Sequence, residues 1–236
     1  MGAPDPLETY RRELAAKRFT VLPADVIISA QQRLAIRASV FGDDCLEPDL
    51  SELHPDRSRA DAVLRFRWSG DDIDLSLGPN AARDPENRQV VSYTANYARA
   101  REYRRLRALE VTELKHLIAQ ICRLLPSDKR LASGLLGVHA LRTFGKVVLG
   151  RHRDGSSDEP VDWVVSFVVS KAGSGAESQL TLDKAGQVLI ARAALNEGQL
   201  MMHQDSMFFH YVTPLEPQPG ARALREAIVV TVRPES

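Results

Sequence analysis

The sequence lacks the features that mark several classes of protein. It contains only two cysteines, Cys45 and Cys122, and no CxxC pair, so we expect no disulfide framework and a chain that tolerates a reducing compartment. No apolar run approaches the ~20 residues needed to span a bilayer. The N-terminus shows no basic-then-apolar signal pattern. We therefore expect a cytoplasmic protein without a membrane partner.

An excess of charge of either sign is also lacking. Lys plus Arg and Asp plus Glu both number 31, so the formal net charge is zero. Domains that bind nucleic acids usually carry a basic surplus, and here only the short stretch 99–107 is locally basic. Nucleic acid is therefore not an expected partner.

The size and composition favour a folded enzyme-sized chain. The 236 residues are 44% hydrophobic and 26% charged, which allows a substantial core. We find no internal repeat and no linker. We therefore expect one domain over residues 1–236, in which 1–134 forms a helical and mixed N-terminal support and cap and 135–236 forms the core that carries the functional site.

The N-terminal half mixes helical and strand patterns. Apolar spacing and capping residues predict three helices, and two alternating segments predict a hairpin. The acidic, proline-containing segment 42–59 is interpreted as a loop. The expected elements are helices at 5–18, 24–41 and 112–125, the last capped by Thr112, with strands at 64–68, 73–77 and 90–93.

The stretch 93–107 combines aromatic and basic residues. Its plain interpretation is the solvated face of a helix, because charge runs usually are solvated. A more specific interpretation is a lid that contacts an anionic group of a substrate, with Tyr97 as a candidate contact.

The C-terminal half changes to short strands at close spacing. Many short strands separated by turns are typical of a sandwich or barrel. The expected strands are 136–144, 146–152, 163–170, 178–182, 187–192, 199–204, 208–213 and 226–233.

A candidate metal site lies in the run Gly150-Arg-His-Arg-Asp-Gly155. His152 and Asp154 are two residues apart, so on extended backbone both side chains project to the same face. His210, on a distant apolar strand, would complete a set of two histidines and one carboxylate. That set is the facial triad of non-haem Fe(II) oxygenases, which leaves metal positions open for substrate and oxygen.

The other histidines are weaker candidates for a metal site. His210 alone would more often be a satisfied core histidine. A second pair, His203-Gln-Asp205, is interpreted as a strand end, with Asp205 helping the turn at Ser206. The remaining three, His54, His116 and His139, are expected to be structural or exposed.

A 2-oxoglutarate oxygenase also needs a cation deep in its barrel for the far carboxylate of the co-substrate. Arginine suits this role because its fork binds a carboxylate through two hydrogen bonds. Arg225 lies in the final strand, where it shares one face with Ala227. Arg222 and Arg233 are competitors, the first in a turn-rich connection and the second near the chain end.

Five motifs, taken in order, resemble the bacterial 2-oxoglutarate/Fe(II) dioxygenases that include L-isoleucine hydroxylases and N-succinyl-leucine hydroxylases. The resemblance covers the chain after residue 135 and is faint before it. The motifs are Gly150-Arg-His-Arg-Asp-Gly155, Asp162-Trp-Val-Val165, Gly175-Ala-Glu-Ser178, His210-Tyr-Val-Thr-Pro214 and Arg225-Glu-Ala-Ile-Val-Val-Thr231.

The resemblance implies a mainly β fold with flanking α-helices and a double-stranded β-helix (jelly-roll, cupin-like) core. It implies His152, Asp154 and His210 as iron ligands, Arg225 as the 2-oxoglutarate anchor and Thr213 in the same pocket. Two positions depart from the family pattern: the strand after Trp163 ends in Lys171, and Ala176 replaces a glycine. The substrate pocket is therefore expected to differ. Arg142 either pairs with a substrate or co-substrate carboxylate or is structurally paired.

The expected activity is Fe(II)-dependent hydroxylation of an unactivated C–H bond in a free amino acid or close derivative. The reaction would consume 2-oxoglutarate and O2 and give succinate and CO2. A carboxylate at Asp154 disfavours halogenation, which needs that position for a halide. Alternatives are a larger or carrier-bound substrate, a desaturation, a cupin-like metal protein without oxygenase activity and, less favoured, a demethylase of protein or nucleic acid. The substrate is expected to be a small molecule, and the sequence leaves a homodimer open.

Overall fold

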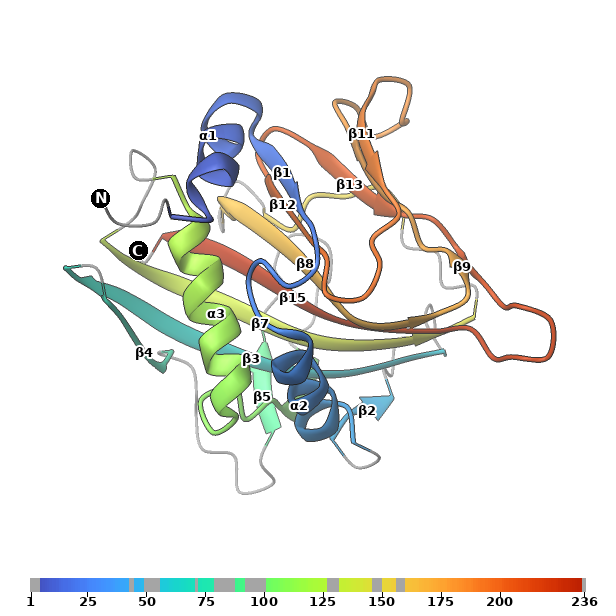
Figure 1. Cartoon of the computed structure of the whole chain (residues 1–236), viewed down its shortest axis with the longest axis horizontal. Helices are drawn as coiled ribbons and strands as arrows, with labels where there is room; N and C mark the ends of the chain where they lie inside the picture. The colour runs from blue at the N-terminus through green and yellow to red at the C-terminus, as the bar shows by residue number, and fades with distance from the viewer. Residues whose placement is uncertain are drawn as a thin grey trace.

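A computed structural model of the chain describes residues 5–42, 45–48, 56–70, 72–78, 88–91, 101–126, 132–145, 150–155 and 160–234. Two β-sheets face each other, and helices lie across the far side of the larger one (Figure 1). This two-sheet arrangement is the jelly-roll architecture with flanking helices.

The larger sheet has ten strands and draws on both halves of the chain. Its strands pair antiparallel except for β3 with β6, which are parallel. Two short strands, β2 (Glu47–Pro48) and β4 (Asp72–Leu77), pair with β3 at its side. The main order is β1 (Phe19–Leu22), β12 (Leu200–Gln204), β8 (Trp163–Ala172), β15 (Leu224–Pro234), β7 (Ser133–Phe144), β3 (Arg57–Ser69), β6 (Arg101–Arg105) and β5 (Arg88–Val91).

Three helices cover one face of this sheet, which we call the outer face. They are α1 (Glu8–Lys17), α2 (Ala30–Val40) and α3 (Thr112–Leu124). α3 buries its apolar stripe completely, and Leu117 and Ile121 join a core that contains Phe167 and Ile228 of the sheet. Burying such a stripe is the main source of helix stability in a folded protein.

The opposite, inner face looks toward a smaller sheet of order β11–β10–β13. Its strands are β11 (Leu189–Ala193), β10 (Ser178–Thr181) and β13 (Phe209–Val212), and β9 (Ser174–Gly175) pairs with β14 (Leu215–Glu216) beside it. Val168 and Met201 of the larger sheet pack against Leu180 of the smaller one. Residues of the inner face therefore line the space between the sheets.

Several N-terminal predictions needed correction. α2 begins at Ala30 rather than residue 24, because Ser29 forms a capping box with Gln32. α3 has Val111, not Thr112, at its capping position. The predicted loop 42–59 was wrong at its end, since β3 already begins at Arg57.

The stretch 93–107 is also corrected in part. Residues 101–105 form strand β6, not a helix. Tyr97 lies outside the described residues. The predicted hairpin was confirmed, with Leu64 opposite Leu77 and Trp68 opposite Ile73.

The C-terminal strands follow the prediction closely. The segment 146–152 is the exception: residues 146–149 lie outside the described part, and His152 makes an isolated bridge with His210. Among the described residues, no helix is long and apolar enough to cross a membrane.

Candidate metal and co-substrate site

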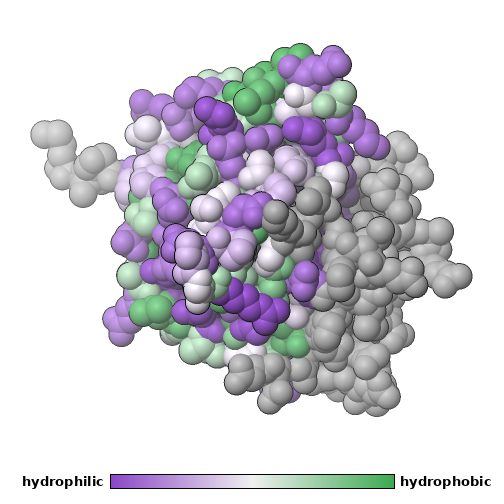
Figure 2. Space-filling model, turned by 90° about the vertical axis from the view of Figure 1, so that its right-hand side faces the viewer, coloured by the Kyte–Doolittle hydropathy of each residue, from purple (hydrophilic) through white to green (hydrophobic). Residues whose placement is uncertain are grey.

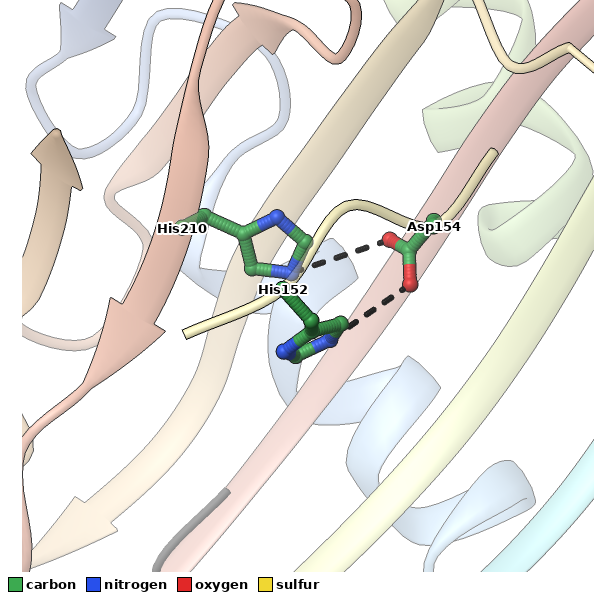
Figure 3. A group of neighbouring side chains, drawn as sticks. All are labelled: His152, Asp154 and His210. Carbon is green, nitrogen blue, oxygen red and sulfur yellow. Dashed lines mark ion pairs between the residues drawn. The ribbon is translucent and has the colours of Figure 1, made fainter. Parts of the chain in front are cut away.

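The three expected iron ligands converge at one point between the sheets (Figure 3). Paired backbone hydrogen bonds hold His152 against His210, with N···O distances of 3.1 and 2.9 Å. One oxygen of Asp154 lies 3.6 Å from His152 Nε2, and the other lies 3.7 Å from His210 Nε2. Potential ligand atoms of all three residues lie within 4.8 Å of one another.

The tautomer of His152 suits metal binding. Its Nδ1 lies 2.8 Å from the Gly150 carbonyl oxygen and can donate a proton to it. That leaves the Nε2 lone pair on the side of Asp154. A hydrogen bond at one ring nitrogen commonly orients the other toward a metal.

The charges of the site also suit a metal. Burial alone would raise the pKa of Asp154, but His210 and His152 beside it hold that pKa well below its usual range. Burial lowers the pKa of His210 to about 4. At neutral pH the carboxylate is therefore ionised and His210 is neutral, which is the state that binds a metal. The donor set fits Fe(II).

Asp205 organises the loop that carries Asp154. Its Oδ1 accepts the Asp154 N–H and its Oδ2 accepts the Gly155 N–H, both at 2.9 Å. A side chain at position 155 would meet Val161 N at 2.5 Å, so the loop needs glycine there. The prediction that Asp205 helps the turn at Ser206 missed this role, which is a contact between residues far apart in sequence.

His203 and Asp205 form a second group of possible ligands with His210. The His203 ring lies 5.1 Å from the His210 ring, and burial holds the pKa of His203 well below its ordinary value. Both oxygens of Asp205 already accept backbone N–H groups. The first triad, whose side chains keep some exposure, is therefore the better metal site.

Arg225 lies on the inner face, as its alternation with Ile228 predicted. Its Nη2 donates to Ser166 Oγ at 3.0 Å, and its Nε has no hydrogen-bond partner in the part of the chain that the structure describes. Burial lowers its pKa to about 10, so it stays charged at neutral pH. A buried guanidinium requires an anion to compensate its desolvation. The sequence did not indicate the contact with Ser166.

Thr213 and Arg142, the other two expected residues in the described region, have protein partners. Thr213 Oγ1 accepts the Glu177 N–H at 2.9 Å. Arg142 donates to Glu226 from Nε and Nη2, at 2.9 and 2.8 Å. Glu226 follows Arg225 on β15 and points to the outer face, where it and Arg142 line an open cavity of about 450 Å³. The structural pairing considered for Arg142 is therefore present.

Solved structures share this fold at low sequence identity. A bsmA homolog from Methylobium petroleophilum PM1 is 21% identical, with a TM-score of 0.76 over 99% of this chain and 95% of the other. The Fe(II)/(alpha)ketoglutarate-dependent dioxygenase TqaL is 13% identical, with a TM-score of 0.67 over 98% and 90%. A Pseudomonas putida prolyl-4-hydroxylase is 12% identical, with a TM-score of 0.54 over 98% and 100%. No curated protein matches the chain.

A family model gives the broader assignment. The model for 2OG-Fe dioxygenase matches residues 48–231, a range that contains the metal triad, Ser166 and Arg225. The chain therefore belongs to the 2OG-Fe dioxygenase family, whose members are oxygenases that use Fe(II), 2-oxoglutarate and O2.

Proposed function

We propose that this dioxygenase hydroxylates an unactivated C–H bond of a free amino acid or close derivative. The oxygenase part is supported mainly by the convergence of His152, Asp154 and His210 between the two sheets. Arg225 is buried on the same inner face, and its Nε has no hydrogen-bond partner among the described residues. The amino-acid part rests on the motifs shared with amino-acid hydroxylases.

The residues of the chain would bind and orient the metal and 2-oxoglutarate. His152, Asp154 and His210 would hold Fe(II) and leave other metal positions open. Arg225, steadied by Ser166, would bind the far carboxylate of 2-oxoglutarate with charge-assisted hydrogen bonds. When bound, the iron, 2-oxoglutarate and O2 supply the oxidising chemistry, with succinate and CO2 as by-products.

Asp154 favours hydroxylation over halogenation. Its carboxylate would occupy the third protein position on the metal, and Asp205 accepts its backbone N–H. That position is not available to a halide.

The test is turnover by anaerobically purified, Fe(II)-loaded protein. The protein is given 2-oxoglutarate, O2 and a pool of free amino acids, and succinate and oxygenated products are measured by mass spectrometry. Asp154→Ala and Arg225→Ala are expected to abolish both products. Arg222→Ala is the matched control, because Arg222 is exposed and stacks on Phe144.

The outcomes separate the alternatives. Succinate with one oxygenated amino acid supports the proposal and names the substrate. Succinate without an oxygenated amino acid supports a carrier-bound or larger substrate instead. The absence of both turnover and 2-oxoglutarate binding would support a cupin-like metal protein without oxygenase activity.

A further inference from the structure

The two histidines of the metal triad come from segments that a single β-bridge joins. Their rings stack with centroids 4.2 Å apart (Figure 3). His152 lies outside every described strand, and no backbone hydrogen bond beyond the two of its bridge with His210 joins residues 150–155 to 209–212. A slip of one residue would turn His152 away from the metal, because successive side chains of an extended segment point to opposite faces.

Side-chain contacts on either side of the bridge join the same two segments. Arg151 precedes His152, and its Cζ lies 4.8 Å from the centre of the Tyr211 ring. Arg153 follows His152, and its Cζ lies 4.3 Å from the centre of the Phe209 ring. We call Arg151–Tyr211 and Arg153–Phe209 the flanking pairs. They continue the antiparallel register of the bridge by one residue in each direction.

The flanking pairs lie on the face of the smaller sheet that is turned away from the metal. His210 lies opposite Leu180, which packs between the sheets, whereas Tyr211 lies opposite Gln179. Adjacent residues of a strand point to opposite faces, so Tyr211 points away from the inner space. Arg151 Nη2 also donates to Gln179 Oε1 at 3.3 Å, so the same guanidinium contacts β10 as well as β13.

The turn between β10 and β11 packs against the guanidinium of Arg151. A Cβ at Gly186 would lie 2.4 Å from Arg151 Cζ, so a residue with a side chain could not approach this closely. The Nε atoms of Arg151 and Arg153 are buried and have no hydrogen-bond partner among the described residues. Contact with the neighbouring ring is therefore what the described structure offers both side chains in common.

Attraction for the metal does not explain two arginines at these positions. Both are next to His152 in the sequence, and a positive charge near a metal cation weakens its binding by repulsion. A cation over the face of an aromatic ring is, by contrast, favourable. The flanking pairs therefore fit a role in holding the two segments together.

We infer that Arg151 and Arg153 are positioning residues of the metal site, whose flanking pairs keep His152 in register with β13. The inference rests on the metal triad of the proposed function. With that register kept, both imidazoles lie on the side of Asp154. Loss of a flanking pair should therefore weaken metal binding, although neither arginine is a metal ligand.

The test measures Mn(II) affinity of the full-length protein by calorimetry. Arg151→Met removes the cation, and we expect Mn(II) to bind about 10-fold more weakly. Loss of charge repulsion alone would instead tighten binding. Arg151→Lys, which can keep a cation over the ring, should recover most of the affinity. Arg153→Met tests the second pair in the same way.

A spectroscopic measurement reports the geometry of the ligands directly. The visible absorption of Co(II)-loaded protein depends on how the ligands surround the metal. We expect this spectrum to change in Arg151→Met and to return in Arg151→Lys. A substitution that only lowered the stability of the fold would leave the spectrum of the folded, loaded protein unchanged.

The chain offers a matched control and a double-mutant cycle. Arg222 stacks on Phe144 with its Cζ 3.9 Å from the ring centre, and neither residue adjoins a triad residue. Arg222→Met should therefore leave Mn(II) affinity and the Co(II) spectrum unchanged. Arg151→Met and Tyr211→Leu remove the same flanking pair, so the double variant should bind Mn(II) about as well as the weaker single variant.

The outcomes separate this inference from the proposed function. Unchanged or tighter Mn(II) binding by Arg151→Met would overturn the positioning role, even if the thermal-unfolding midpoint fell. An equal loss in Arg222→Met, or additive losses in the double variant, would overturn it too. In each case the triad would stand. A wild type that does not bind Mn(II), or whose affinity is unaffected by Asp154→Ala, would instead refute the triad and the proposed function with it.

Discussion

Asp205 and Asp183 each hold a loop in place with a carboxylate. Each carboxylate accepts two backbone N–H groups of a loop, Asp205 from Asp154 and Gly155, and Asp183 from the β10–β11 turn. Of the two, only Asp205 holds the backbone of a proposed metal ligand, Asp154. Because an amide offers one acceptor oxygen, Asp205→Asn leaves one N–H unpaired and lets Asp154 move. We expect Mn(II) affinity to fall about 10–100-fold.

Asp183→Asn supplies the matched control for that measurement. It removes an equivalent pair of contacts in a turn that carries no triad residue, and Mn(II) affinity should stay unchanged in a calorimetric titration. Equal affinities for the two variants would show that Asp205 does not position the ligand.

A separate prediction concerns Arg225 and the binding of 2-oxoglutarate. Arg225→Lys keeps the positive charge but loses the planar fork that binds a carboxylate through two bonds. We expect 2-oxoglutarate to bind at least ~10-fold more weakly to the Mn(II)-loaded protein, with Mn(II) affinity unchanged. Arg222→Lys is the control. A parallel loss of metal binding would mean that Arg225 supports the fold rather than the co-substrate.

The apolar residues of helix α3 and hairpin β10–β11 should contribute differently to the free energy of unfolding. Leu117 of α3 is fully buried, whereas Leu189 of β11 is 47% exposed. The hairpin projects from the top of the molecule in Figure 1. Figure 2 shows hydrophobic surface at the top of the molecule, where the hairpin lies. Leu117→Ala should lower the free energy of unfolding by about 2–5 kcal/mol. Leu189→Ala should change it by no more than about 0.5 kcal/mol.

Urea unfolding of both variants measures this difference. The two substitutions remove the same atoms, so burial is the main difference between them. Similar losses would indicate that the hairpin is covered in solution, for example by a second copy of the chain.

Strand β3 shows why a sequence pattern can fail to predict where a strand begins. Its second half alternates clearly and was predicted, but residues 57–59 fell at the end of the predicted loop 42–59. In the structure these charges face inward and compensate one another, as Arg59 does with Asp61. A strand with buried ion pairs has the same charged composition as a solvated loop. The composition does not show that each charge has a partner. Short-range signals, such as the hairpin of β3 with β4, were recovered.

The whole molecule explains which site residues the sequence could reveal. His152, Asp154 and His210 follow from residue type and spacing, and Arg225 follows from strand alternation. Ser166 and Asp205 depend on which strands become neighbours, such as β8 beside β15. That order is set by the packing of the complete sheet, and no local pattern encodes it.

Burial of the histidines makes the stability of the metal-free protein depend on pH. Burial lowers the folded-state pKa of His210 to about 4 from an ordinary 6.5. Its contribution is therefore fully present above pH 6.5 and is lost as the pH falls toward 4. His203 acts in the same direction. Asp205 opposes them, because burial raises its pKa to about 6, and its contribution is lost as the pH rises through 6.

His152 also opposes His210 and His203, because burial alone would lower its pKa but the neighbouring Asp154 raises it. The clear prediction is therefore a difference between two proteins: between pH 6.5 and 4 the His210→Asn variant should lose less unfolding free energy than the wild type, because it lacks the contribution of His210. Urea titrations of both proteins across this range measure the slopes. An unchanged slope in the variant would mean that His210 has the same pKa in the folded and the unfolded protein, which would contradict the lowering by burial.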